Sequence, residues 1–399
     1  MSADPNTLLY LEFLQKSYYA NNDFLLDHSI KKTASQVIET IRNQGLRVNN
    51  DVEELFQKLD EQVKLPTPYE DPISYFIMTN LAREIEQSIV ELRFRLPVRP
   101  LLGTIPSGRL NAMTILVRRT NEFIVLFERQ LFGFAYEMSK IIAQVIPFEG
   151  VIGQNIKFAI SKEKLSQIEK NLSRHPEIEN QMREVVIAYL MKGNPNIIEP
   201  TLVSWPSYPL AGILTNSAEL FILGHEYGHI LCGHFDQSKL VQSFIGEEQV
   251  VQVVPQWNQE HEADMKGLEL MIHAQQRNQT SVVTSFWGAD FFFSCMDILE
   301  RGISFVETGN EGDRRLNDHP PTALRREVIR QGLMDSLPKD IGEPAINLGM
   351  FLESIMEMLF KGMCPYLMQL NKMGYQLADR WKIKKISNCS ATVGCNSQY

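Results

Sequence analysis

The 399-residue sequence predicts a predominantly helical α+β fold. Three observations support this prediction: apolar residues recur at helical spacing along most of the chain, β-branched runs are few, and prolines and glycines separate the helical stretches. Hydrophobic residues make up 44% of the chain and charged residues 22%, which is typical of a globular protein with a sizeable core. The length accommodates one large domain or two to three ordinary ones.

The first two hundred residues are expected to form mainly helices. The segment 95–110 interrupts them, because its prolines and glycines are typical of a loop or a domain boundary. Apolar spacing and turn signals predict several helices, the last with a break near residues 132–133. They are Leu8–Ala20, Ile30–Asn43, Val52–Val63, Ile73–Arg95 and Leu110–Ile146.

The middle of the chain combines one strand with two helices. β-Branched residues indicate a short strand over Ile197–Ser204. The next helix has a start signal at Asn216, whose side chain can cap it, with Glu219 three residues on as in a capping box. A further helix is expected over Asn258–Arg277.

The segment Pro344–Trp381 is expected to be helical and rich in methionine. Methionine at such spacing usually fills a core, and a surface that binds a partner protein is the alternative. The methionines concerned are Met350, Met356, Met358, Met363, Met368 and Met373.

The composition argues against several classes of function. With 39 basic and 48 acidic residues the net charge is −9, and because nucleic-acid binding needs clustered Lys and Arg, no nucleic-acid partner is expected. The N-terminus lacks the pattern of a signal peptide. The longest apolar candidate, Phe286–Leu299, is too short for a membrane span and contains Asp290 and Asp297, so no integral membrane segment is expected. Five scattered cysteines favour a reducing cytoplasm.

Residues 225–229 read HEYGH, a pattern that suits a metal ion. His225 and His229 lie one turn apart on one face of a helix, so both imidazoles can reach the same ion. Zn²⁺ binds neutral imidazole nitrogens in a tetrahedral shell. Glu226 is turned by roughly 100° from His225 and can take a proton from a metal-bound water without becoming a ligand. Taken alone, the motif also fits two ordinary interior histidines.

A third ligand follows thirty-one residues after His229, in the stretch QEHEADMKGLELM. Glu260 and Asp264 are four residues apart and share a helix face. Glu260 can complete a shell of two imidazoles and one carboxylate, which leaves the fourth zinc position open for water. Asp264 can then accept a hydrogen bond from a ligating imidazole and fix its orientation. Glu262 points to nearly the opposite side and is the alternative ligand if the helix register differs.

The neighbours of these residues carry further expectations. Gly224 and Gly228 each destabilise a helix by about 1 kcal/mol relative to alanine, and close approach of another backbone or of a substrate would explain them. Ala263 is expected to keep the contact between the two helices tight. His261 is expected to face solvent, and His234 is either an outer partner of the metal site or an ordinary polar end of the helix.

HEYGHILCGH has the HExGHxxxGH form of the gluzincin metallopeptidases that include the CAAX prenyl-protein endopeptidases and the HtpX-like and Oma-like quality-control proteases. QEHEADMKGLELM resembles their ExEAD segment, in which the first Glu binds zinc. Residues 318–325 resemble their HP-x4-R element, and the three blocks stand in the family order over about residues 205–330. The resemblance implies that His319 and Arg325 lie near the active site and steady the substrate or the oxyanion. A helix-entry turn with a structural salt bridge is the alternative.

The chain also departs from this family. The members just named are embedded in or tethered to membranes, whereas no spanning segment is expected here. Residues 1–200 and about the last sixty residues match nothing in the family. In its layout and its short motif the chain also resembles phage-exclusion peptidases of the Lit type, which are intracellular proteases with an HExxH motif that cut a host translation factor.

These observations predict a zincin-like catalytic core with a small sheet inside a chain of four regions. The regions are a helical N-terminal region 1–100, a helical region 101–200 leading into the core, a zinc metallopeptidase core 201–335 and a helical Met-rich region 336–399.

The expected function is a soluble zinc endopeptidase, of a regulated, defence or quality-control type, that cleaves a protein or peptide substrate. His225, His229 and Glu260 would hold the metal, Glu226 would act as general base, and the substrate would lie along the strand 197–204. A regulatory partner is expected to act through the flanking helical regions. The alternative is a zinc-containing protein-binding module without turnover, although such a module has no need of Glu226.

Overall fold

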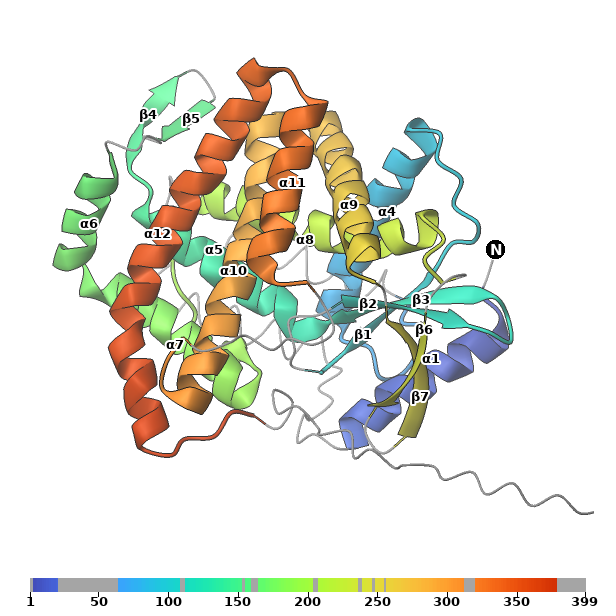
Figure 1. Cartoon of the computed structure of the whole chain (residues 1–399). Helices are drawn as coiled ribbons and strands as arrows, with labels where there is room; N and C mark the ends of the chain where they lie inside the picture. The colour runs from blue at the N-terminus through green and yellow to red at the C-terminus, as the bar shows by residue number, and fades with distance from the viewer. Residues whose placement is uncertain are drawn as a thin grey trace, which may run out of the picture.

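The structure is a computed structural model that describes residues 3–20, 64–107, 112–152, 155–158, 164–203, 207–235, 239–245, 248–254, 256–311 and 320–378. Within these ranges the fold is predominantly helical α+β, as the sequence predicts. Figure 1 shows the helices packed side by side, with a small sheet at one side of them. Most buried hydrophobic residues between 78 and 377 form one connected cluster, and a second, smaller cluster joins Leu11 and Leu14 to buried residues between 105 and 126. The division into four regions stays a prediction.

A three-stranded sheet occupies a part of the chain where the sequence predicts a loop or domain boundary (95–110) followed by a helix, and its first strand shows that 95–110 is not all loop. Its strands β1 (Leu101–Ile105), β2 (Ala112–Val117) and β3 (Glu122–Glu128) have the order β1-β3-β2. Strand β3 pairs parallel with β1 and antiparallel with β2. The predicted helix Leu110–Ile146 is therefore wrong in its first half, and only α5 (Arg129–Val145) is helical. The run from Phe123 to Phe127 is buried on both faces, so it shows no alternation that would mark it as a strand.

Two of the predicted N-terminal helices, Leu8–Ala20 and Ile73–Arg95, fall within the described residues and are confirmed. Helix α1 (Pro5–Ala20) packs against β1, and α4 (Pro72–Glu91) begins at Asp71, whose carboxylate accepts a hydrogen bond of 2.8 Å from the backbone N–H of Ser74. The predicted helices Ile30–Asn43 and Val52–Val63 lie outside the described residues.

The predicted strand Ile197–Ser204 is wrong over the part that the structure describes. After β4 (Phe148–Ile152), β5 (Asn155–Phe158), α6 (Leu165–Arg174) and α7 (Pro176–Lys192), the chain forms a short 3₁₀ helix, η2 (Pro195–Ile197). Residues 198–203 have no regular structure. The side chain of Asn194 accepts a hydrogen bond from the backbone of Asn196, and proline at the first position favours this turn over a strand.

Helix α8 (Ser207–Leu231) begins nine residues before the predicted cap. Asn216 lies inside the helix and accepts a hydrogen bond of 2.7 Å from Gln275. The preceding residues extend the helix because they pack on α5, where Thr215 and Ser139 share a hydrogen bond of 2.6 Å. Tertiary packing thus overrides the local capping signal.

Helix α9 (Trp257–Arg277) matches the predicted helix Asn258–Arg277 and begins with a capping box between Gln256 and Gln259. A two-stranded antiparallel ribbon, β6 (Lys239–Ile245) and β7 (Glu248–Val254), connects α8 to α9. In Figure 1 this ribbon lies below the end of α9, beside the sheet.

Backbones of α8 and α9 touch at three glycines. A Cβ atom on Gly224 would lie 2.9 Å from the carbonyl oxygen of Gly267, and one on Gly228 would lie 2.8 Å from that of Ala263. A Cβ on Gly267 would lie 2.6 Å from the backbone nitrogen of His225. Real Cβ contacts of this length are excluded by steric repulsion, so the expectation that the glycines admit a neighbouring backbone is confirmed.

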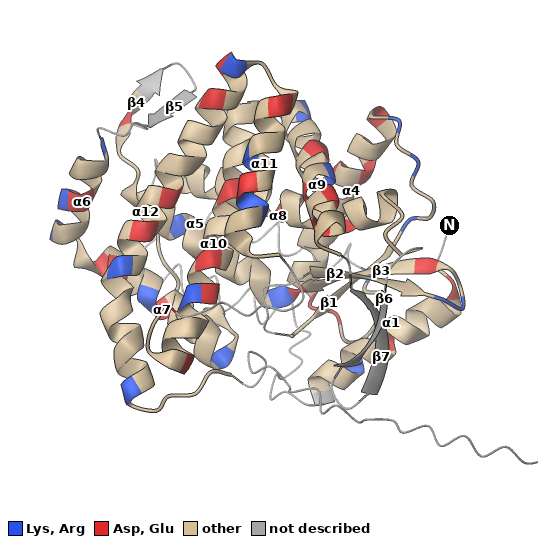
Figure 2. Ribbon diagram, in the orientation of Figure 1, with Lys and Arg blue, Asp and Glu red and all other residues tan. Residues whose placement is uncertain are grey.

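Three helices complete the fold: α10 (Val282–Thr308), α11 (Thr322–Ser336) and α12 (Lys339–Lys372). The predicted C-terminal helix is thus confirmed up to Lys372. Met356 and Met363 are buried in the core, whereas Met350, Met368 and Met373 are exposed. Figure 2 shows Lys and Arg interspersed with Asp and Glu along α6, α11 and α12.

By length and composition alone, α10 is the one helix in the described part of the chain that meets the criterion for a membrane span. It is longer than the apolar segment Phe286–Leu299 read from the sequence. Of its apolar window, 67% is buried inside the protein, and core helices of soluble proteins meet the same criterion. The expected absence of an integral membrane segment stays a prediction.

Gly228→Ala is predicted to lower stability by about 1–3 kcal/mol, because the new methyl group must push α9 away from α8. Gly212→Ala is the matched control: a Cβ at this position of the same helix would meet no neighbouring atom within 4 Å, and the change is expected to add up to about 1 kcal/mol. Denaturant unfolding of both variants tests this, and a stable Gly228→Ala variant would contradict the close crossing.

Glu219→Gln is predicted to change the pH dependence of stability. Burial raises the pKa of Glu219 to about 8 from an ordinary value of 4.5, so the folded state favours the neutral acid. The contribution of the neutral Glu219 side chain to the free energy of unfolding is fully present below pH 4.5 and is lost as the pH rises through about 8. The variant, which cannot ionise, should gain on the order of 5 kcal/mol over the parent at pH 9 and little at pH 4.

The measurement is denaturant unfolding at both pH values, with Glu343→Gln on the exposed face of α12 as control. Parallel profiles of parent and Glu219→Gln would contradict the raised pKa.

Candidate metal centre

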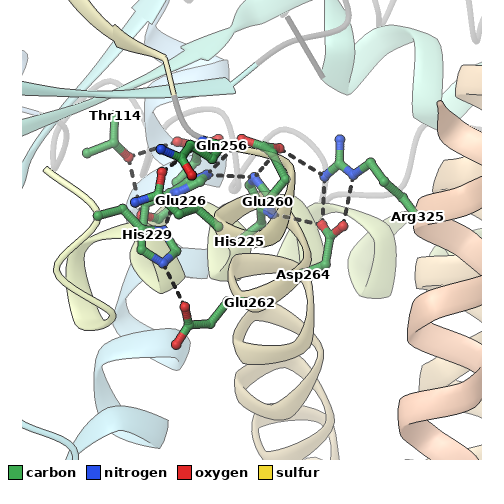
Figure 3. A network of polar contacts seen from close by, with 11 residues as sticks. Thr114, His225, Glu226, His229, Gln256, Glu260, Glu262, Asp264 and Arg325 are labelled. Atoms are coloured by element: carbon green, nitrogen blue, oxygen red, sulfur yellow. Dashed lines mark hydrogen bonds and ion pairs between the residues drawn. The ribbon is translucent and has the colours of Figure 1, made fainter. Parts of the chain in front are cut away.

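Two imidazoles from α8 and one carboxylate from α9 converge on a single point (Figure 3). His225 Nε2 and His229 Nε2 lie 3.0 Å apart. Glu260 places Oε2 3.6 Å from His225 Nε2 and Oε1 3.5 Å from His229 Nε2. All three side chains are buried, with Glu260 fully enclosed. The i, i+4 spacing on α8 and the glycine contacts with α9 produce this convergence.

The other ring nitrogen of each imidazole faces a separate partner. His225 Nδ1 lies 2.8 Å from Asp264 Oδ1, and His229 Nδ1 lies 2.8 Å from the Nδ1 of His234. A hydrogen on each Nδ1 leaves both Nε2 lone pairs pointing at each other and at the Glu260 carboxylate. Acceptor groups at such separations repel one another unless a cation lies between them. The donor set therefore fits a metal ion.

Negative side chains gather around this point. Three carboxylates are buried, those of Glu226, Glu260 and Asp264, and the buried guanidinium of Arg325 faces two of them, Glu260 and Asp264. A divalent cation held by the two imidazoles and Glu260 would add positive charge among these carboxylates.

Burial and charge act in opposite directions on the two imidazoles. Burial disfavours the charged form of His225, but Asp264 and Glu260 outweigh burial, so the pKa of His225 is raised. Burial, together with charge on His225, holds the pKa of His229 well below its ordinary value. His229 is therefore a neutral imidazole, which is the form that binds a metal.

Glu226 lies beside the convergence point and is held by the sheet. Its Oε2 accepts a hydrogen bond of 2.8 Å from the hydroxyl of Thr114, which lies on β2. The same hydroxyl is 3.2 Å from the backbone carbonyl of Glu226. Thr114 was not predicted from the sequence, because its segment was read as helix and no local pattern links it to residue 226.

Asp264 connects the site to α11 through Arg325. The guanidinium donates two hydrogen bonds to the carboxylate, of 2.8 Å from Nε and 2.6 Å from Nη2, and lies over the ring of Phe293. Burial opposes ionisation of Asp264, but Arg325 and His225 outweigh it and lower its pKa. Arg325 thus lies beside the proposed centre, with Nη2 3.8 Å from Glu260 Oε2, and forms a buried salt bridge with Asp264, whereas a role in steadying the substrate or the oxyanion stays a prediction. His319 lies outside the described residues.

Glu262 points away from the convergence point, as the helix geometry predicts. Its side chain is 62% exposed, and its Oε2 lies 3.1 Å from the Nε2 of His234. His234 is thus an outer partner of His229 rather than an ordinary helix end. His261 is half-buried instead of facing solvent.

Comparison of the chain with protein-family models, with curated proteins and with solved structures gives no match. The likeness to gluzincin metallopeptidases therefore rests on the quoted sequence motifs alone.

Asp264→Asn is predicted to weaken metal binding by about 10–100-fold, because an amide no longer holds His225 as the carboxylate does. Glu269→Gln, on the same helix but with its side chain 44% exposed, is the control and should bind as the parent does. Competition with a chelator of known affinity measures both. Equal affinity of Asp264→Asn and parent would show that Asp264 does not orient the ligand.

Proposed function

We propose that the protein is a zinc-dependent endopeptidase that cleaves a protein substrate. The observation that supports this is the convergence of His225, His229 and Glu260 with a separate carboxylate, Glu226, immediately beside them. A purely structural zinc site usually has four protein ligands and no general base. Two imidazoles and one carboxylate suit zinc and leave a position for water.

When bound at this site, zinc would lower the pKa of a water ligand to about 7 and polarise the scissile carbonyl. Glu226 would act as general base toward a water held at the site and as general acid toward the leaving amine. The hydrogen bond from Thr114 fixes one oxygen of the Glu226 carboxylate, so the side chain keeps its orientation during both transfers. Burial of Glu226 limits competing water.

Strand β2 replaces 197–204 as the strand proposed to bind substrate. It lies at one edge of the three-stranded sheet and carries Thr114, which contacts Glu226. An extended peptide can pair with such an edge through backbone hydrogen bonds. The scissile bond would then run past Glu226.

Asp264 and Arg325 act as positioning residues in this proposal. Asp264 orients His225, and Arg325 holds Asp264 through two hydrogen bonds. Neither group needs to touch the substrate. A catalytic role for His319, taken from the family resemblance, stays a prediction.

Several wider expectations belong to this proposal. The HExGHxxxGH, ExEAD and HP-x4-R blocks favour a gluzincin-type peptidase. Because an unrestrained cytoplasmic protease is harmful, we propose regulation through a partner that binds the helical regions outside residues 201–335.

Glu226→Gln is predicted to keep its metal and to lose cleavage by about 10²–10⁴-fold, because the amide cannot accept the proton. Metal content of the purified protein and cleavage of an unfolded protein substrate measure the two effects. A comparison of new protein termini in cells that produce the parent with those in cells that produce the variant would identify the substrate. Glu269→Gln is the control and should cleave as the parent does.

Cleavage by Glu226→Gln at the parental rate would rule out the mechanism. Metal binding without turnover in the parent on any unfolded protein would instead favour a zinc-containing protein-binding module.

A further inference from the structure

Three further metal-ligating side chains lie beside the proposed centre. The ligand atoms of Cys232, His234 and Glu262 are all within 4.8 Å of one another. Cys232 and His234 lie in the turn directly after α8, and Glu262 lies on the first turns of α9. The cluster therefore uses the same two helices as the proposed centre and lies on the outer side of His229.

The backbone holds these three groups in place. The N–H of Cys232 bonds to the carbonyl of Gly228 at 2.9 Å, and that of His234 bonds to the carbonyl of His229 at 3.1 Å. Gly233 between them adopts a φ of 68°, a conformation that favours glycine and turns the chain back. The glycine contacts between α8 and α9 fix the position of Glu262 against this turn.

The donor chemistry selects the kind of cation. Sulfur, imidazole nitrogen and carboxylate oxygen together suit zinc and similar thiophilic divalent ions, and are unsuited to calcium or magnesium. His234 is buried, Cys232 is half-buried and the side chain of Glu262 is 62% exposed. A cation can therefore arrive from solvent without opening the fold.

A single hydrogen links this cluster to the proposed centre. His229 Nδ1 and His234 Nδ1 are 2.8 Å apart, so one must donate and the other must accept. A cation on Nε2 of His229 requires the hydrogen to be on Nδ1 of His229. A cation on Nε2 of a neutral His234 requires a hydrogen on Nδ1 of His234. Both requirements together place two N–H groups against each other.

We propose that Cys232, His234 and Glu262 form a second, weaker zinc site whose occupation opposes metal binding at His225, His229 and Glu260. The antagonism rests on the proposed function of the first centre, whereas the ligands of the second site do not. Excess zinc then acts as an inhibitor through this second site. By linkage, each ion lowers the affinity for the other by the same factor.

The site is tested by adding Co²⁺ to the full-length protein whose first centre already holds zinc. Sulfur-to-cobalt charge transfer absorbs in the near ultraviolet and reports a thiolate ligand, which the first centre lacks. We expect this band to rise as Co²⁺ is added and to level off at one further metal ion per chain. Cys232→Ser should abolish it, and Cys364→Ser, which alters another half-buried cysteine, should leave it unchanged. No band in the parent, or a band that persists in Cys232→Ser, would overturn the site.

The antagonism is tested with His225→Ala, which disables the first centre. Relief of the opposed N–H groups should tighten Co²⁺ binding at the second site about tenfold. An independent measurement avoids any folding defect of that variant: excess zinc should inhibit cleavage by the parent and should inhibit Cys232→Ser far less. Equal affinity in His225→Ala and equal inhibition of the two proteins would overturn the antagonism.

These results separate the two proposals. A cobalt–thiolate band in a protein that cleaves nothing would remove the peptidase proposal and keep the second site. Cleavage that depends on Glu226, without any cobalt–thiolate band, would keep the peptidase proposal and remove the second site.

Discussion

The direct backbone contact between α8 and α9 is the constraint on which the proposed centre depends. Side chains with a Cβ at Gly224, Gly228 or Gly267 would separate the two helix axes, and Glu260 would no longer reach the imidazoles. Each of these glycines destabilises its own helix relative to alanine, but a residue without a Cβ is needed for the two backbones to approach this closely. Helix crossing, rather than any loop, thus determines the positions of all three proposed ligands.

A chain of contacts extends from this crossing into the rest of the fold. His225 leads through Asp264 to Arg325 on α11, and Glu226 leads to Thr114 on the sheet. These partners come from parts of the chain that are distant in sequence. The charged groups are buried and mutually dependent, so the loss of one leaves its partner in an apolar environment without compensation.

The sequence predicts the parts of the site that depend on helical periodicity. His225 and His229, and Glu260 and Asp264, are pairs four residues apart, and the structure brings the two pairs together as expected. Thr114 could not be predicted, since its position depends on strand pairing across residues that show no alternating pattern.

The errors in the fold have similar causes. The segment before α5 contains an apolar run, and whether such a run forms a helix or a strand depends on the elements it packs against. The cap predicted at Asn216 is wrong because the preceding turns pack on α5 and extend the helix. The contact of Thr114 requires knowledge of how elements pack, and the contact of His234 with His229 depends on the turn at Gly233 rather than on helical spacing. Local spacing carries none of that information.

Between the two ligand-bearing helices the chain makes an excursion of more than twenty residues, most of it the β6–β7 ribbon. Since the helices fix the centre by their own contact, the excursion is not needed to bring the ligands together. The length and composition of this ribbon, which contacts β2, can therefore change during evolution without displacing the proposed ligands. If the proposed function holds, differences in substrate choice between related chains are expected to lie in this ribbon.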